Sequence, residues 1–198
     1  MDILELYIDE EMDKDNVFAI SVVENPAIEE DWIALKSQTI ELAEVDKDKH
    51  ILMGAALIPN LNILRKDKEG NDYYVFFSEE TVKKASELFL IRGMQNNSTL
   101  EHEFKLKGLS VVESWIVEDE KMDKSAKYNL GLSVGTWAVC VKVDNDDIWD
   151  NYVKTGKIKG FSIEGHFSNR VSSGNSAEEQ ESLNTIKQLT KILEDEQK

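Results

Sequence analysis

Short runs of β-branched and aromatic residues recur through the middle of the chain, and this pattern restricts the fold more than any other feature. The six runs lie at residues 51–58, 73–77, 100–104, 109–117, 135–143 and 160–167. Turn-forming residues and two amphipathic segments, 79–92 and 146–155, separate them. Strands of this length between short turns are typical of antiparallel sheets. The sequence therefore predicts an α+β domain with a mostly antiparallel, barrel-like sheet flanked by two helices.

Local signals mark where two of these elements begin and end. The charged segment 67–72 lies between two strand-type runs, which predicts a β-hairpin. Ser78 stands directly before Glu79 and Glu80, a pattern typical of a helix N-terminus, where a hydroxyl caps the first turn and acids meet the positive end of the helix dipole. Gly93 predicts the end of that helix.

The domain organisation follows from length and from changes in composition. A chain of 198 residues favours one core with appended segments over two full domains. We expect an acidic N-terminal arm at residues 1–49, with two short strand-type runs at 4–8 and 17–23, and a main domain at 50–171. A flexible linker and a C-terminal helix follow at 172–198. That helix is expected to lie on the body or on a partner, or to form a short coiled coil.

Charge and cysteine content restrict the partners and the compartment. The chain has 39 acidic and 23 basic residues, a net charge of −16, which argues against a nucleic-acid partner. The N-terminus is acidic and nowhere do about 18 apolar residues run together, so we expect neither a signal peptide nor a membrane span. With Cys140 as the only cysteine, no internal disulfide forms. These features predict a protein of the cytoplasm.

Several classes of chemistry lack their sequence motifs. The chain has no phosphate-binding loop, no dinucleotide fingerprint and no His-Glu-x-x-His helix, so we expect no cofactor. Glu101, His102 and Glu103 are adjacent, and adjacent strand residues face opposite ways, so we expect no metal site there. Cys140 lies among apolar residues, a setting that raises a thiol pKa and disfavours a nucleophile. Acyl transfer by a hydroxyl remains possible.

Two residues are candidates for that chemistry. Ser162 lies between Gly160 and Gly165, and glycines on both sides allow a close approach of a substrate to the backbone. A small residue packed in a strand is the alternative interpretation. His102 follows a polar loop and is flanked by carboxylates that favour an imidazolium, although a structural or surface histidine gives the same pattern. Spacing alone does not join the two residues.

A series of ordered motifs joins them through a resemblance to a known family. The motifs are Gly54-Ala-Ala-Leu-Ile-Pro59, Tyr73-Tyr-Val-Phe-Phe-Ser-Glu-Glu-Thr81, Leu100-Glu-His-Glu103, Val111-Val-Glu-Ser-Trp-Ile-Val117, Gly135-Thr-Trp137, Val143-Asp-Asn-Asp146 and Gly160-Phe-Ser-Ile-Glu-Gly165. Together they resemble the XkdF-like phage serine proteases, a family similar to other prohead proteases and, in fold, to the herpesvirus assemblins. The resemblance implies that His102 is the base, that Ser162 is the nucleophile, and that residues 50–171 form the protease domain.

The third member of the catalytic group is less constrained by the resemblance. Assemblins use a second histidine and other prohead proteases are thought to use an acid. Glu113, in the Glu-Ser-Trp motif after His102, is the first choice to orient the imidazole. Asp144, Glu164 and His166 are the alternatives, and Glu113 could equally be a solvated strand residue or a salt-bridge partner. The oxyanion hole stays unassigned.

The function implied by the resemblance is maturation of the phage head. The expected activity is serine endopeptidase cleavage of scaffold and major capsid proteins, with self-cleavage and self-association, inside the prohead in the host cytoplasm. No nucleic acid, membrane, metal or cofactor is expected to take part. The alternative is a non-enzymatic scaffold or assembly factor on the same fold. A cytoplasmic hydrolase of small esters is a third possibility.

Overall fold

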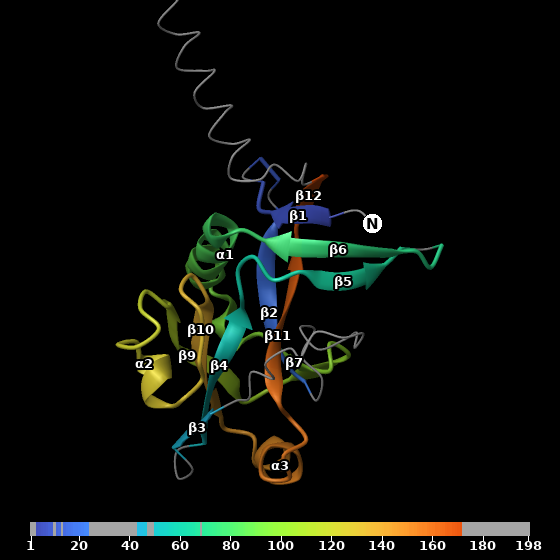
Figure 1. The fold of residues 1–198 in the computed structure, drawn as a ribbon. Coiled ribbons are helices and arrows are strands. Elements are labelled where there is room, and N and C mark those ends of the chain that lie inside the picture. Colours follow the sequence, from blue (N-terminus) through green and yellow to red (C-terminus); the bar gives the residue numbers. More distant parts are fainter. Residues whose placement is uncertain are drawn as a thin grey trace, which may run out of the picture.

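The computed structural model describes residues 3–9, 11–12, 14–23, 43–46, 50–67 and 69–171, which form a mixed α+β fold dominated by strands (Figure 1). The strands are β1 (Ile3–Tyr7), β2 (Asn16–Val23), β3 (Ala43–Asp46), β4 (Ile51–Leu57), β5 (Ile63–Lys66), β6 (Asp72–Phe77), β7 (Ser98–Leu100), β8 (Phe104–Leu106), β9 (Leu109–Ile116), β10 (Trp137–Val143), β11 (Gly160–His166) and β12 (Ser168–Val171). The helical segments are α1 (Glu79–Ile91), η1 (Met94–Asn96), α2 (Lys124–Lys127), α3 (Asp146–Ile148) and the π-helical turn η2 (Trp149–Val153).

The described strands form three four-stranded sheets, ordered β12-β1-β6-β5, β3-β4-β10-β9 and β11-β2-β7-β8. Most neighbours are antiparallel, and the two parallel pairs are β1 with β6 and β2 with β7. Among the described residues these sheets do not close into a barrel, so the barrel-like part of the fold prediction is not confirmed. The six predicted strands are instead distributed over three sheets: β6 pairs with β1 and β5, β4 and β9 pair with β10, and β7 and β11 pair with β2.

The N-terminal strands are integral to this fold, although the sequence analysis placed them in an arm. In β2, Val17, Ile20 and Val22 are at most 1% exposed. An apolar run of this kind is stable in water only when both of its faces are covered. The body of the protein therefore includes residues well before position 50. The expected linker at 172–176 and the helix at 177–198 lie outside the described residues.

Helix α1 covers part of the core. Ser78 caps it, because its hydroxyl accepts a hydrogen bond from the Thr81 N–H. The buried face of the helix includes Phe89, whose ring meets the Trp137 ring edge-on with the centroids 5.3 Å apart. The cap and the amphipathic pattern are local signals, so the helix predicted at 79–92 is confirmed almost to the residue. The helix expected at 146–155 is shorter, and consists of α3 followed by η2, whose π-helical turn is wider than an α-helical one.

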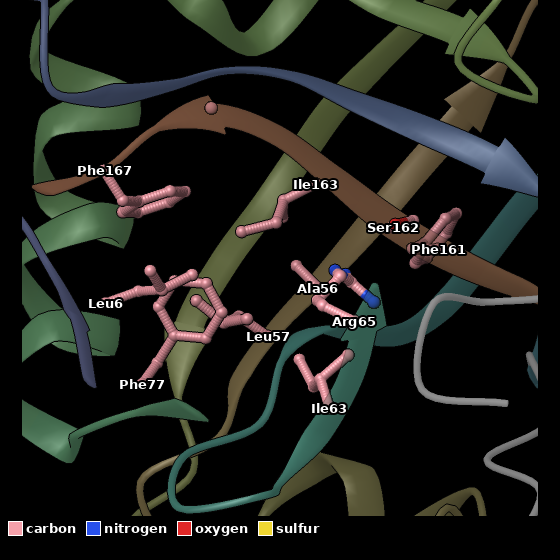
Figure 2. Close-up of a pocket in the computed structure, with 11 residues that line it drawn as sticks. Leu6, Ala56, Leu57, Ile63, Arg65, Phe77, Phe161, Ser162, Ile163 and Phe167 are labelled. Carbon is pink, nitrogen blue, oxygen red and sulfur yellow. The ribbon is translucent and has the colours of Figure 1, made fainter. Parts of the chain in front are cut away.

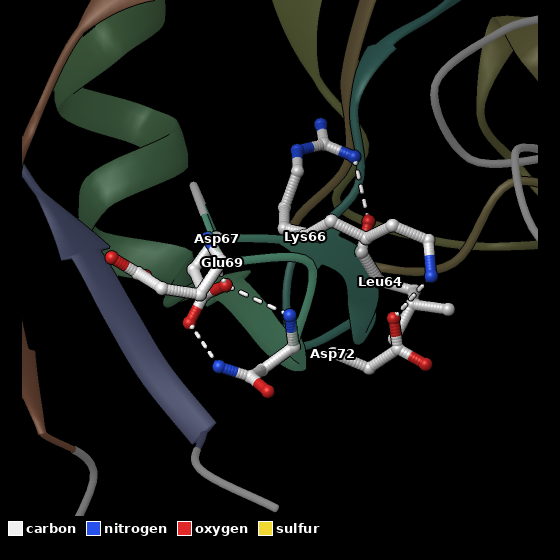
Figure 3. Close-up of polar contacts among 7 residues, drawn as sticks. Leu64, Lys66, Asp67, Glu69 and Asp72 are labelled. Atoms are coloured by element: carbon white, nitrogen blue, oxygen red, sulfur yellow. Dashed lines mark hydrogen bonds and ion pairs between the residues drawn. The ribbon is translucent and has the colours of Figure 1, made fainter.

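The predicted hairpin is also confirmed, and its turn is held by one carboxylate (Figure 3). The Asp67 carboxylate accepts hydrogen bonds from the Glu69 N–H and from the N–H and side chain of Asn71. The bond from the Asn71 side chain and then those from the backbone lower the pKa of Asp67. At the base of the turn, Lys66 Nζ lies 2.6 Å from an oxygen of Asp72.

The strand predicted at 100–104 is wrong, and the error concerns a candidate site residue. β7 ends at Leu100 and β8 begins at Phe104, with a tight turn between them. Glu101 and His102 in this turn have φ values of 51° and 59°, the left-handed region that few residues with a Cβ adopt. Apolar residues on both sides of the charged triplet resemble a continuous strand in sequence. Because of the turn, His102 lies at the tip of a hairpin.

The buried carboxylate of Asp15, directly before β2, connects this part of the chain to the start of β12 through hydrogen bonds. Asp15 is 2% exposed, and its Oδ2 accepts hydrogen bonds from the N–H groups of Ser168 at 2.8 Å and Asp9 at 3.2 Å. Burial alone raises the pKa of Asp15, but the bonds from Ser168 and Asp9 outweigh burial, and the pKa is lowered. The ionised form therefore stabilises the fold above the pKa of an unfolded aspartate, about 4, and this stability is lost as the pH falls through the lower folded value.

The Asp15→Asn variant is expected to lower the free energy of unfolding by about 1.5 to 3 kcal/mol at pH 7, since it removes hydrogen bonds to a charged acceptor. The difference from the parent protein should shrink as the pH falls below about 4 towards pH 3, because the parent protein then loses the stability that ionised Asp15 provides. Urea unfolding at both pH values measures this. Asp150→Asn, which removes an exposed ion pair with Lys154, is the control and should have little effect at either pH. An equal loss at both pH values would show that the stabilisation does not come from the ionised carboxylate of Asp15.

Candidate active site

Ser162 lies in β11, an outer strand of the sheet β11-β2-β7-β8. It is 6% exposed and stands directly opposite Ser21 of β2. Residues opposite each other on neighbouring strands point to the same face of a sheet. Within the described part of the chain, no residue hydrogen-bonds to the Ser162 hydroxyl. Ser162 is therefore a nearly buried residue whose hydroxyl is not committed to a structural bond.

His102 lies at the tip of the β7–β8 hairpin, and two contacts hold it against the same sheet. Its backbone N–H donates a hydrogen bond of 3.1 Å to Ser21 Oγ. Its ring Nδ1 lies 3.3 Å from Oε1 of Glu164. The side chain of His102 is 41% exposed, so the ring borders solvent. Ser162 faces the same side as Ser21, so the imidazole and the hydroxyl belong to one face of the sheet.

Glu164 connects these elements. It lies two residues after Ser162, and alternate residues of a strand share a face. Its Oε1 also accepts a hydrogen bond from the Thr99 hydroxyl on β7. A carboxylate at Nδ1 favours the tautomer in which Nδ1 carries the proton and Nε2 is free to accept one. Such an imidazole can act as a general base, and the carboxylate stabilises the imidazolium that forms.

The other candidates for the orienting residue lie elsewhere. Glu113, the first choice from sequence, is on β9, an outer strand of a different sheet, where it forms an ion pair with Lys124. Asp144 forms an ion pair with Lys142, with the two atoms 2.8 Å apart.

The remaining candidate, His166, is a histidine whose ring packs against Phe18 with the centroids 5.3 Å apart. Of the four sequence candidates, only Glu164 has a contact with His102 among the described residues.

Sequence reasoning missed two members of this group, Ser21 and Thr99. Ser21 is fully buried; besides the bond from the His102 N–H, its hydroxyl donates to the Thr99 carbonyl at 3.3 Å. The available signal was that Ser21 is the one hydroxyl residue in the otherwise apolar run 17–23. A buried polar group needs a hydrogen-bonding partner. Thr99 carries no comparable signal, since it belongs to a polar stretch.

A cavity of about 210 Å³ adjoins β11 and includes Ser162 in its lining. Figure 2 shows Phe161 and Ile163 of β11 around it, with Phe77 of β6 and Arg65 of β5. Gly165 also lines it, and a Cβ there would lie 2.7 Å from the Asn16 carbonyl oxygen, so no larger residue fits without a shift. The cavity is smaller than the sites that hold whole drug-sized ligands. It has room for a single apolar side chain.

A thiol and possible metal ligands are the other reactive groups to consider in the described residues. Burial raises the pKa of the Cys140 thiol, although Lys124 Nζ at 3.7 Å from Sγ opposes the rise. The described residues contain no group of three or more His, Cys, Asp or Glu side chains suited to a metal ion. None of their helices has the length and apolar character needed to span a membrane. The face with Ser162 and His102 is thus the best-supported reactive site in the described residues.

Comparison with known proteins gives a family assignment. The family described as "Putative phage serine protease XkdF" matches residues 39–171. The match includes His102, Ser162 and Glu164, and it begins after β2. No curated protein and no solved structure matches the chain.

Proposed function

Since the chain belongs to the XkdF family of phage proteins, we propose that it is a serine endopeptidase in which Ser162 is the nucleophile and His102 is the general base. The observation that carries this proposal is the 3.3 Å contact between His102 Nδ1 and Glu164, on the face to which Ser162 belongs. Nucleophile, base and orienting carboxylate together form a Ser-His-acid triad, an arrangement that performs acyl transfer. In this proposal Glu164 takes the orienting role first considered for Glu113.

The proposed reaction has two acyl-transfer steps. His102 Nε2 accepts the proton of the Ser162 hydroxyl as the oxygen attacks the peptide carbonyl carbon. His102 then gives this proton to the leaving amine, the C–N bond breaks, and an ester on Ser162 remains. Water attacks the ester while His102 takes its proton, and return of the proton to Ser162 releases the acid. Glu164 keeps its negative charge throughout and stabilises the imidazolium.

The biological role that we propose is maturation of the phage head. The substrates would be scaffold and major capsid proteins, and other copies of this chain, within the prohead in the host cytoplasm. The phage family supports this role, because tailed-phage heads are assembled as precursors around scaffold protein. The segment 172–176, rich in Ser, Gly and Asn, is the type of sequence in which self-cleavage is tolerated. A non-enzymatic scaffold or assembly factor is the main alternative.

Labelling with a fluorophosphonate tests the enzymatic proposal directly. The full-length protein is expected to gain one phosphonyl group at neutral pH, and peptide mapping should place it on Ser162, since only an activated serine reacts quickly with this reagent. Protein unfolded in urea is the control and should not react. Absence of labelling, or labelling at another serine, would contradict the assignment.

Incubation with substrates then separates the hydrolase classes. We expect cleavage of co-expressed scaffold or major capsid protein, detected by mass spectrometry, and negligible turnover of small esters. A labelled protein that hydrolyses esters but leaves the head proteins intact would favour the ester hydrolase over the endopeptidase.

A further inference from the structure

Ser21 has an unusual position for a residue in an apolar strand. Its side chain is fully buried in β2, where a hydroxyl without hydrogen bonds would destabilise the fold. It has two partners: it accepts from the His102 N–H at 3.1 Å and donates to the Thr99 carbonyl at 3.3 Å. One hydroxyl thus links β2 both to β7 and to the turn that follows β7.

The turn that it contacts is conformationally demanding. Glu101 and His102 are both in the left-handed region, which side chains with a Cβ seldom occupy without support from their surroundings. The Glu101 N–H donates to the Val22 carbonyl at 3.2 Å, and the Glu103 N–H donates to the Leu100 carbonyl at 3.1 Å. Ser21 supplies the bond to the amide of His102 itself. The backbone of the proposed base is therefore fixed by β2.

The place of Ser21 in the sheet links it to the nucleophile. It stands opposite Ser162 on one side and opposite Thr99 on the other. We infer that Ser21 is a positioning residue, which holds the His102 backbone so that the imidazole contacts Glu164 and faces Ser162. This role rests on the proposed function. It lies in β2, before the span 39–171 that matches the family, so the reactive site depends on an N-terminal strand outside that span.

The Ser21→Ala variant tests this role. We expect kcat for cleavage of the scaffold protein to fall by about 10- to 100-fold with KM changed by less than about threefold, because a misplaced base slows the chemical step more than it affects binding. Labelling of Ser162 by the fluorophosphonate should slow by a similar factor. Ser98→Ala is the matched control, since Ser98 is a 2% exposed serine in the same sheet on β7. Equal effects of the two variants would overturn the role of Ser21.

A second pair of variants removes the effect of packing. Ser21→Thr and Ser21→Val have nearly the same shape and suit a strand, but only threonine keeps the hydroxyl. Threonine is expected to retain at least about ten times the kcat of valine. Similar kcat values for the two would overturn the role, including in the case that Ser21→Ala does not fold.

Hydrogen exchange separates this inference from the proposed function. The His102 amide should exchange at least about tenfold faster in Ser21→Val than in Ser21→Thr, whether or not the protein cleaves anything. If wild-type protein neither cleaves nor reacts with fluorophosphonate while this difference is seen, the protease proposal fails and the Ser21–His102 bond stands. If cleavage occurs but the exchange rates are equal, the role of Ser21 fails alone.

Discussion

The Ser162→Ala variant is expected to lower kcat for cleavage of the scaffold protein by roughly 10⁴-fold or more, because the acyl ester cannot form without the nucleophile. Stability should change little. The side chain is nearly buried, but its hydroxyl makes no hydrogen bond within the described residues, so its removal leaves no partner unsatisfied. Time courses followed by gel electrophoresis and mass spectrometry give the rate, and thermal unfolding checks the fold.

The control for this variant is again Ser98→Ala, which is expected to cleave at close to the parent rate. In phage, Ser162→Ala should arrest heads with uncut scaffold protein. Mature heads with cut capsid protein in this variant would remove the enzymatic proposal and favour a scaffold or assembly role on the same fold. Loss of cutting with an unchanged melting temperature would support the protease.

The second large effect is expected at Glu164, the carboxylate that we propose orients His102. Glu164→Gln keeps an oxygen that can accept the Thr99 hydroxyl but removes the charge beside His102 Nδ1. A neutral amide no longer stabilises the imidazolium and can favour the wrong tautomer. The corresponding change in a serine protease triad lowers kcat by about 10⁴-fold. We therefore expect a loss of about 10²- to 10⁴-fold in kcat, with a small change in KM.

Glu113→Gln is the matched comparison, because it makes the same chemical change at the residue first favoured from sequence. It breaks a partly exposed ion pair with Lys124, and such pairs contribute little to stability. Its kcat is expected to stay within about twofold of the parent. Steady-state kinetics on both variants decides between the two carboxylates, since a greater loss in Glu113→Gln would return the orienting role to Glu113.

The proposed site also depends on a part of the chain outside the family match. Glu164 lies on β11 and His102 lies in the turn after β7, on opposite sides of β2 in the sheet, and β2 precedes residue 39. A fragment that begins at residue 39 lacks both β2 and Ser21. The site is therefore a property of the whole sheet rather than of its matched residues.

Local interactions determined what the amino-acid sequence alone could predict. The Ser78 cap, the charged turn around Asp67 and the apolar alternation of β11 act within a few residues, so the helix, the hairpin and the strand were predictable. The family motifs likewise indicated Ser162 and His102 as candidates. The left-handed turn at His102 was missed because its flanking residues have strand propensity and its supporting bonds come from β2.

Only the tertiary structure decided which carboxylate meets His102 and which hydroxyl holds it. The Ser21–His102 bond spans 81 residues and the Thr99–Glu164 bond spans 65. Contacts at such separations depend on strand order and register, and a shift of one residue in register turns every side chain of a strand to the other face. Glu113 and Glu164 look alike in sequence, but they occupy different sheets, and the arrangement of β2 between β11 and β7 brings Glu164 to the imidazole.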